Sequence, residues 1–309
     1  MSAAASAVPK PRDIHRRAVL ALVAATLLWS VAGVVTRHLH HANGLQLVFW
    51  RSSFAALAVA AVLLARDGAP ALLRTVRDGA APLWTSALLW CVMYTAFMLA
   101  LSLTTVAQTL VVDSLSPLCA ALLGRVLLRH RLPARTWVAI AVASAGMVWM
   151  CLHDLHATSS GRELLGLLVA LCVPLAAAGN WVNMRRSAGH GALQAAPMLG
   201  AALSALLVAL PAGALAVDAH DLAWLAFLGV FQLALPGTLA VWAAQRLLPA
   251  EVGLLGLLEV VFGTAWAWLG AGERPTTATL GGGALILGAL LANEALGWWR
   301  APLARRRVA

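Results

Sequence analysis

The fold is decided by the stretch PLWTSALLWCVMYTAFMLALSLTTVAQTLVVDSLSPLCAALLGRVLL, residues 82–128. It consists of two apolar runs, 82–102 and 105–128, with almost nothing between them. A bilayer core about 30 Å thick needs about 20 helical residues, so either run is long enough to cross it. Neither run alternates polar and apolar residues, which excludes a membrane β-barrel. The stretch therefore predicts a hairpin of two transmembrane helices.

The rest of the chain has the same character. Hydrophobic residues make up 61% of the 309 residues and charged residues 11%, whereas a soluble domain has about 25% charged residues. These proportions exclude a soluble enzyme, a disordered chain and a secreted disulfide scaffold. Apolar runs lie at 18–36, 45–65, 82–102, 105–128, 134–152, 163–184, 192–213, 222–245, 250–271 and 277–299. The sequence thus predicts an all-α membrane protein with ten transmembrane helices.

The charges of the chain agree with this number of spans. There are 22 basic and 12 acidic residues, a net charge of +10. If the N-terminus is cytoplasmic and the sides alternate, all but four basic residues fall on the cytoplasmic side, as the positive-inside rule demands. The four exceptions are Arg37, Arg51, Arg162 and Arg274. The excess positive charge is therefore a topology signal and not a nucleic-acid-binding surface. We expect an inner-membrane protein with both termini in the cytoplasm.

The first apolar run also has to be compared with a signal peptide, since basic residues precede it. It is longer than the apolar core of a signal peptide, which has about 7–15 residues. Cleavage would also leave an odd number of spans. We therefore expect the run to remain as the first transmembrane helix.

The chain contains an internal repeat. A shift of 143 residues places the third to fifth runs on the eighth to tenth without a gap, and pairs Thr95 with Thr238 and Arg131 with Arg274. Five spans are an odd number, so the second copy must be inverted, and inverted repeats place a binding site between them near the bilayer midplane. The predicted division is a cytoplasmic tail (1–17), a first five-helix repeat (18–152), an inverted second repeat (163–299) and a basic cytoplasmic tail (300–309).

Several motifs lie at matching places in this pattern. They are Leu28-Trp29-Ser30-Val31-Ala32-Gly33 in the first run, Trp50-Arg51 in the second, Ser116-Pro117-Leu118 in the fourth, Leu257-Leu258-Glu259-Val260-Val261 followed by Gly272-Glu273-Arg274-Pro275 around the ninth, and Gly281, Gly282, Gly283 and Gly288 in the tenth. With these motifs the chain resembles, over about residues 18–297, the EamA-type transporters of the drug/metabolite transporter superfamily. The resemblance implies ten helices, alternating access, and export or exchange of small metabolites.

Two positions depart from the family pattern. The Gly-Glu-Arg that usually closes the fourth helix is Arg129-His130-Arg131 in this chain, and the frequent Pro after the glutamate of the ninth helix is Val260. The first half is therefore the more divergent copy, and the resemblance does not single out one member of the superfamily.

Two acidic residues lie within apolar runs, where ionisable groups are costly and therefore functional candidates. They are Asp113 in the fourth run and Glu259 in the ninth. The shift pairs Asp113 with Gly256 and Glu259 with Ser116, so the two acids are three residues out of register and occupy matching helix faces. We expect both carboxylates to face one cavity, where they would carry protons or meet a cationic group. The alternative is that they are hydrogen-bonded structural acids.

Further polar and aromatic residues lie at membrane depth and are candidates for the substrate pathway. They are Tyr94, which is the only tyrosine, Trp29, Asn180, Trp181, Asn183 and Gln232. Packing between helices is the alternative for each of them, because membrane helices use Asn and Gln to hold one another.

The remaining motifs do not predict a cofactor. Histidines cluster on the predicted outer side, at His38, His40, His41, His153, His156 and His220. A metal site or a pH sensor is one interpretation, but solvated loop histidines are the simpler one, and we expect no metal. The four cysteines form no CxxC pair, which is typical of packing residues. No strand and no Gly-Lys-Ser accompany the glycines at 281–283, so they do not predict a phosphate site.

These observations favour a secondary transporter over an enzyme. The expected activity is the export of small organic metabolites, amino-acid-like or amphipathic compounds, across the inner membrane by alternating access with proton coupling. Its partners would be the substrate and the lipid bilayer, with no nucleic acid, and the chain would act as a monomer or homodimer. The alternatives are an integral membrane enzyme and a lipid-carrier flippase. An intramembrane aspartyl protease needs two paired aspartates, and only Asp113 qualifies.

Overall fold

The computed structural model describes residues 11–36, 39, 44–104, 109, 112–129, 132–152, 161–213, 215–271 and 277–306. In these ranges the regular structure is entirely helical. The elements are α1 (Pro11–Trp29), α2 (Ala32–Thr36), α3 (Gly44–Asp67), α4 (Ala69–Arg77), α5 (Ala81–Leu103), α7 (Ser116–Leu127), α8 (Ala134–Leu152), α9 (Gly161–Arg186), η1 (Gly191–Ala195), α10 (Ala196–Ala209), α11 (Ala219–Phe227), the π-helix η2 (Leu228–Ala234), α12 (Leu235–Ala244), α13 (Pro249–Gly256), α14 (Leu258–Ala271) and α15 (Thr277–Arg306).

Five helical stretches are long and apolar enough to cross a membrane, judged by length and composition. They are Gly44–Asp67, Ala81–Ala100, Leu164–Arg186, Gly191–Ala209 and Ala219–Ala244. Shorter apolar helices lie at Ser116–Leu127, Ala134–Trp149 and Leu280–Asn293. The protein is therefore an all-helical bundle whose composition fits a lipid environment.

Side-chain size is distributed as in a membrane bundle. Much of the interior consists of alanine, with larger residues such as Trp90 and Leu22 between them, whereas many large apolar side chains point outward. Leu206, Val126 and Leu269 are 71%, 72% and 73% exposed. Small residues let membrane helices approach closely, and large apolar side chains on the outside are stable when lipid covers them.

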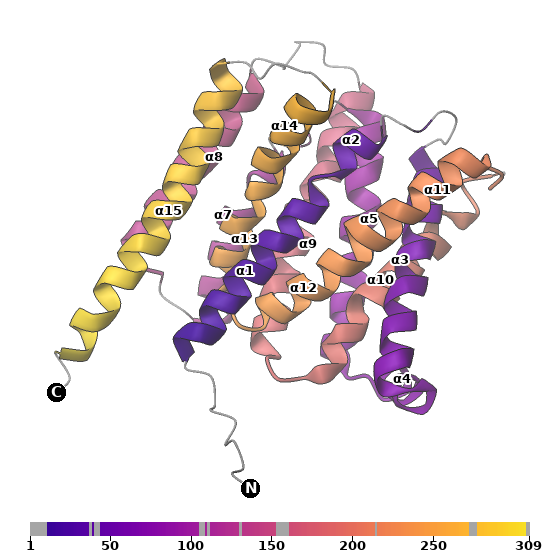
Figure 1. Cartoon of the computed structure of the whole chain (residues 1–309), viewed down its shortest axis with the longest axis horizontal. Coiled ribbons are helices and arrows are strands. Elements are labelled where there is room, and N and C mark those ends of the chain that lie inside the picture. The colour runs from indigo at the N-terminus through magenta and orange to yellow at the C-terminus, as the bar shows by residue number, and fades with distance from the viewer. Residues whose placement is uncertain are drawn as a thin grey trace, which may run out of the picture.

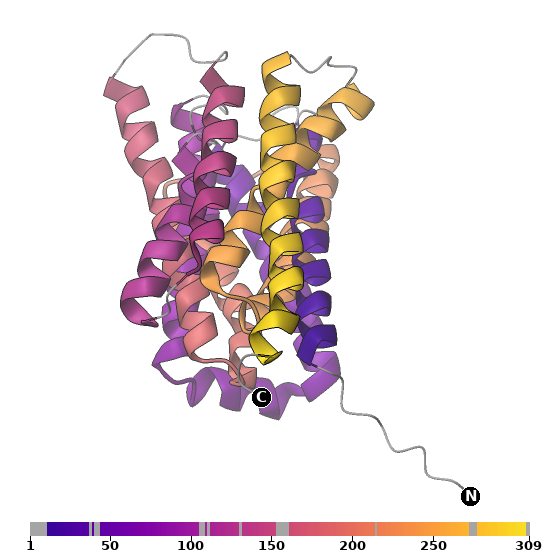
Figure 2. The same ribbon diagram turned by 90° about the vertical axis from the view of Figure 1, so that its left-hand side faces the viewer.

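The helices on the two halves of the chain use matching partners. Helix α5 packs on α9 and α1 packs on α12, while α3 packs on α10, α7 on α13 and α8 on α15. If each helix is replaced by its counterpart in the other half, the pair α5–α9 becomes the pair α12–α1. The other three pairs join counterparts, so the exchange leaves them unchanged. Helices α8 and α15 lie side by side at one edge of the bundle (Figures 1 and 2). The absence of a side chain at Gly281 lets the ring of Trp149 approach there, because an added Cβ would lie 2.7 Å from the ring.

The start of α1 and the end of α15 lie at the same end of the bundle (Figures 1 and 2). Helix α4, in a segment predicted only as a loop, lies across that end (Figure 2). It carries Arg74 and Arg77 in its last turn and exposes Leu73. A short helix with apolar and basic side chains on its surface is typical of a membrane interface.

Three of the long helical passages are interrupted. Helix α1 is separated from α2 by a turn at Ser30 and Val31, α7 follows a turn at Ser114 and Leu115, and α13 is separated from α14 by Leu257. The shift of 143 residues carries Ser114 onto Leu257, so two of the breaks lie at equivalent positions of the repeat. Pro117 falls in the first turn of α7, where a missing N–H costs nothing. Pro174 lies inside α9, which continues past it.

Candidate functional site

A cavity of about 120 Å³ lies between the two halves of the bundle. Its lining comes from α1, α3, α5, α7, α9, η2, α13 and α14, and consists of Leu22, Trp29, Arg51, Trp90, Met93, Tyr94, Phe97, Asp113, Ser116, Val173, Ala177, Trp181, Gln232, Leu233, Val252, Gly253, Gly256, Leu257 and Glu259. Water needs only about 10–15 Å³ of such space per molecule. The cavity therefore holds several waters or a small organic group.

The two acidic candidates lie beside the equivalent helix breaks. Asp113 directly precedes the turn before α7, and its Oδ1 accepts a hydrogen bond of 2.9 Å from the Oγ of Ser116. Glu259 is in the first turn of α14, where the helix dipole favours a carboxylate. The two carboxylates lie close enough to interact electrostatically. The helix breaks thus bring both acids to one cavity from opposite halves of the chain.

The backbones of α7 and α13 cross tightly next to these acids. A Cβ added at Gly253 would lie 2.7 Å from the Cα of Pro117 and 3.3 Å from the carbonyl oxygen of Ser116. Only a glycine permits this approach. The crossing fixes the distance between the two segments that carry Asp113 and Glu259.

Arg51 is a third ionisable group of the cavity, and the charge rule assigned it wrongly to the outer side. It lies about two turns inside α3 and is 2% exposed. Its Nη1 donates to Oε1 of Gln232 and its Nη2 donates to the carbonyl oxygen of Tyr94, both at 3.3 Å. In the described part of the chain its Nε has no hydrogen-bond partner. Its motif, Trp50-Arg51, lies within the apolar run 45–65, so its position already indicated burial, although only Asp113 and Glu259 were predicted as ionisable site residues.

The geometry of η2 brings Gln232 to Arg51. A Cβ added at Gly229 would lie 2.5 Å from the Cβ of Phe54 and 2.7 Å from the carbonyl oxygen of Arg51, so α3 and η2 touch through their backbones. A π-helical turn offsets the side chains that follow it and is frequent at functional sites. Its position predicts a functional use of Gln232.

Aromatic side chains form one wall of the cavity. The ring of Trp90 lies 6.5 Å from that of Trp29, 5.1 Å from Tyr94 and 5.6 Å from Trp181, measured between centroids. The Nε1 of Trp90 is buried and has no acceptor among the described residues. The sequence singled out three of these four rings; Trp90 carried no signal, since tryptophans elsewhere in the chain have ordinary packing roles.

Asn180 and Asn183 are not among the residues that line the cavity, unlike the other six candidates. The Oγ of Ser86 donates to Oδ1 of Asn180 at 2.7 Å, and Nδ2 of Asn183 donates to the carbonyl oxygen of Pro82 at 2.8 Å. Both amides therefore hold α9 against α5, which is the interhelical packing use. Their part in the substrate pathway stays a prediction, and these bonds favour the packing alternative.

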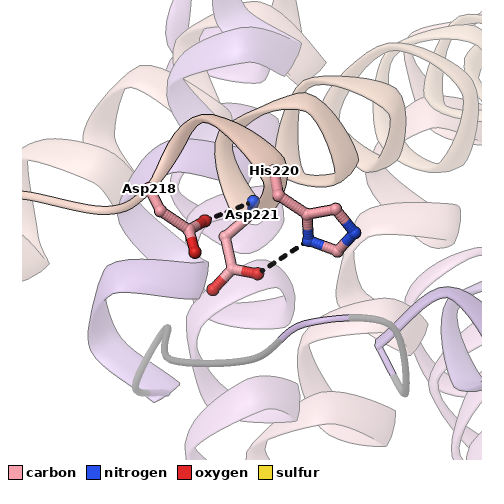
Figure 3. A group of neighbouring side chains, drawn as sticks. All are labelled: Asp218, His220 and Asp221. Atoms are coloured by element: carbon pink, nitrogen blue, oxygen red, sulfur yellow. Dashed lines mark hydrogen bonds and ion pairs between the residues drawn. The ribbon is translucent and has the colours of Figure 1, made fainter.

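The histidine prediction is testable at one residue, His220, because His38, His40, His41, His153 and His156 lie outside the described residues. His220 lies beside Asp218 and Asp221 at the start of α11 (Figure 3). Asp218 caps this helix, since its Oδ1 accepts the backbone N–H of Asp221 at 2.7 Å. The Nδ1 of His220 faces Oδ1 of Asp221 at 3.5 Å, and its Nε2 accepts from Nε1 of Trp224 at 3.3 Å. The ligand atoms of the three side chains lie within 4.8 Å of one another, so the cap accounts for Asp218 and the prediction of no metal stays a prediction.

The fold and the site define a class of protein before any comparison. A helical membrane bundle with broken helices and with ionisable groups around a central cavity is typical of secondary transporters. The model of the EamA-like transporter family matches residues 16–152 and 164–293, and the chain belongs to this family of membrane transporters. The resemblance seen in the sequence motifs is thereby confirmed.

A solved structure supports the fold. It is described as a crystal structure of a protein, is 22% identical to this chain, and has a TM-score of 0.75, with 90% of this chain and 98% of that chain covered. At this identity the similarity concerns the fold alone. A search of the curated proteins found no match.

Proposed function

We propose that the protein is a secondary transporter that exports small organic metabolites, amino-acid-like or amphipathic compounds, across the inner membrane in exchange for protons. The observation that carries this proposal is the meeting of Arg51, Asp113 and Glu259 at one cavity. Three ionisable groups at such a place are costly and are retained where they bind or move charge. Membership in a transporter family and the aromatic wall support a small organic substrate.

The proposed topology is ten membrane crossings in two inverted repeats, 18–152 and 163–299, with both termini cytoplasmic. It is supported by the location of the start of α1 and the end of α15 at the same end of the bundle (Figure 1) and by the matching helix partners of the two halves. Single cysteines in place of Asp78 and Asp218, introduced into a variant lacking the natural cysteines, test it. An impermeant thiol reagent should label them from opposite sides of the membrane, and labelling from the same side would contradict it.

Alternating access follows from this arrangement. Helices broken at equivalent positions next to the site give each half a hinge, so that one half can rock against the other around the cavity. In the proposed cycle a proton and the substrate compete for Asp113 and Glu259. The empty site returns across the membrane with one carboxylate protonated, and it holds the substrate with both carboxylates ionised.

Flux in proteoliposomes tests the proposed coupling. Asp113→Asn and Glu259→Gln remove one carboxylate each with little change in shape, so transport should lose its response to an imposed pH gradient. Asp67→Asn is the matched control, because Asp67 lies at the end of α3 and pairs with Arg66 at the surface. A screen over amino acids, nucleosides and amphipathic amines supplies the substrate. Full coupling in both site variants would overturn the proposal.

A further inference from the structure

We infer that Arg51 is a fixed counter-ion of the cavity, so that the cavity accepts one further positive charge at a time: a proton, or the cationic group of a monovalent organic cation with an aromatic body. This inference rests on the proposed function and names the substrate class of the same site. According to this inference, Arg51 determines which net charge a substrate must have in order to bind in the cavity.

The count of charges comes from every element that lines the cavity. Arg51 of α3, Tyr94 of α5, Asp113 ahead of α7 and Glu259 of α14 are its ionisable side chains, and the described lining residues of α1, α9, η2 and α13 carry none. With Arg51 charged and both carboxylates ionised the cavity has a net charge of −1. A buried net charge is costly, and one added positive charge removes it.

Arg51 is held apart from the carboxylates. Its guanidinium donates hydrogen bonds to the side chain of Gln232 and to the carbonyl oxygen of Tyr94, neither of which is charged. Within the described residues no direct ion pair joins it to Asp113 or Glu259, although Glu259 lies close enough for the two charges to interact. The acids therefore remain open to a ligand, while the guanidinium balances one of their two charges from a fixed position.

The uncharged part of the lining indicates the rest of the ligand. The rings of Trp29, Trp90, Tyr94 and Trp181 line the cavity and form the aromatic wall. Aromatic rings attract cations and stack on other aromatic rings. The buried Nε of Arg51 and Nε1 of Trp90 lack acceptors in the described part of the chain. An oxygen on the ligand, or a water beside it, fits these two donors.

The test measures binding and proton release with purified protein in detergent. The probes are phenyltrimethylammonium, its analogue with a second trimethylammonium group on the same ring, and phenylalanine as a zwitterion. The charges of the two cations are permanent and cannot exchange protons, so calorimetry in buffers of different ionisation enthalpy counts the protons that the protein releases when it binds them. The wild type should bind the monovalent probe with release of about one proton and bind the divalent probe at least roughly tenfold more weakly.

Charge variants at the site give the discriminating results. Arg51→Gln should bind the divalent probe with release of about two protons, and Arg51→Gln combined with Asp113→Asn should return to the monovalent probe and about one proton. Arg51→Lys keeps the charge and should behave as the wild type. If Arg51→Gln does not fold, Asp113→Asn alone tests the same count, because it should lose the monovalent probe.

Three results would overturn the inference: equal binding of both cations by the wild type, unchanged charge preference in Arg51→Gln, or tight binding of phenylalanine with no cation bound. These results leave the proposed function standing if flux still depends on Asp113 and Glu259. Conversely, charge-dependent binding as expected without any flux in proteoliposomes would overturn the proposed function and leave the assignment of Arg51 intact.

Discussion

Replacing Gly229 by alanine should disturb the site without touching any of its side chains. Gly229 lies where η2 crosses α3, and the added Cβ would lie 2.5 Å from the Cβ of Phe54, 2.7 Å from the carbonyl oxygen of Arg51 and 3.0 Å from the amide nitrogen of Ala55. Ordinary contact begins at 3.4 Å, so the closest approach is short by about 0.9 Å. The oxygen and the nitrogen belong to the backbone and cannot rotate away, so the two helices must separate.

The size of the effect follows from this separation. Overpacking of this kind costs about 1–3 kcal/mol. The bond from Nη1 of Arg51 to Gln232 is already 3.3 Å long, so a shift of several tenths of an ångström breaks it. For a chain of 309 residues a loss of about 2 kcal/mol corresponds to a fall in Tm of about 3 °C. Substrate binding should weaken as well, because the guanidinium moves relative to the carboxylates.

Thermal unfolding and flux of the same preparation measure both effects. Gly283→Ala is the matched control, because nothing lies within 4 Å of a Cβ added at Gly283 in α15. In that helix alanine should be neutral or stabilising by up to about 1 kcal/mol. Scans at one heating rate are required, since unfolding of such proteins is commonly irreversible. A Gly229→Ala protein that unfolds with the control and transports normally would refute the close crossing of α3 and η2.

Three further predictions concern other contacts. Asn180→Ala and Asn183→Ala should each lower the free energy of unfolding by about 1 kcal/mol and leave the KM of transport unchanged; a changed KM would place that residue in the substrate pathway. The hydroxyl of Thr136 in α8 donates to the side chain of Asn293 in α15 at 3.1 Å. Thr136→Val and Asn293→Leu should therefore show a coupling of about 0.6 kcal/mol in a double-mutant cycle of thermal unfolding. Strict additivity of the two effects would contradict the bond. Asp218→Ala should cost about 1 kcal/mol through the lost cap. Zn²⁺ or a chelator should leave Tm unchanged, because the carboxylate of Asp218 is used by the backbone N–H of Asp221; a shift of Tm with Zn²⁺ would reveal a metal site.

The positions of the helices could be predicted because hydropathy reports directly on membrane length. Helix α8 has the bounds of its apolar run, 134–152, and α3 extends the run 45–65 by only one and two residues. Helix α1 begins at Pro11, seven residues before its run, because polar residues of good helix propensity continue the helix beyond the apolar part. Hydropathy marks only the apolar part of a helix, whereas the helix itself ends where its backbone groups no longer find hydrogen-bond partners within the helix.

The sequence could not distinguish a polar residue that holds two membrane helices together from one that lines the cavity. Asn183 and Gln232 are both amides at membrane depth, yet one bonds the carbonyl oxygen of Pro82 and the other the guanidinium of Arg51. The difference lies in which helix each one faces, and the partners are more than a hundred residues away. The same applies to Arg51. The positive-inside rule assigned it to one side of the membrane by its position in the sequence, which does not show which helices its side chain contacts.

The internal repeat predicts where the cavity lies, but it does not predict which ionisable side chains line it. The 143-residue shift carries the break at Ser114 onto the break at Leu257, so the two backbones interrupt at the same depth and open one cavity between them. The side chains do not follow: Asp113 precedes its break, Glu259 follows the other, and each is paired by the shift with an uncharged residue, Gly256 or Ser116. Had the acids been symmetry mates, each would approach the site from an equivalent direction and the two would have the same surroundings. Their offset places Asp113 beside the hydroxyl of Ser116 and Glu259 at a helix start. The two backbones are thus symmetric, whereas the two carboxylates have different surroundings. Together with Arg51 they give the cavity two negative charges and one positive charge, which is what the proposed exchange of a single positive charge requires.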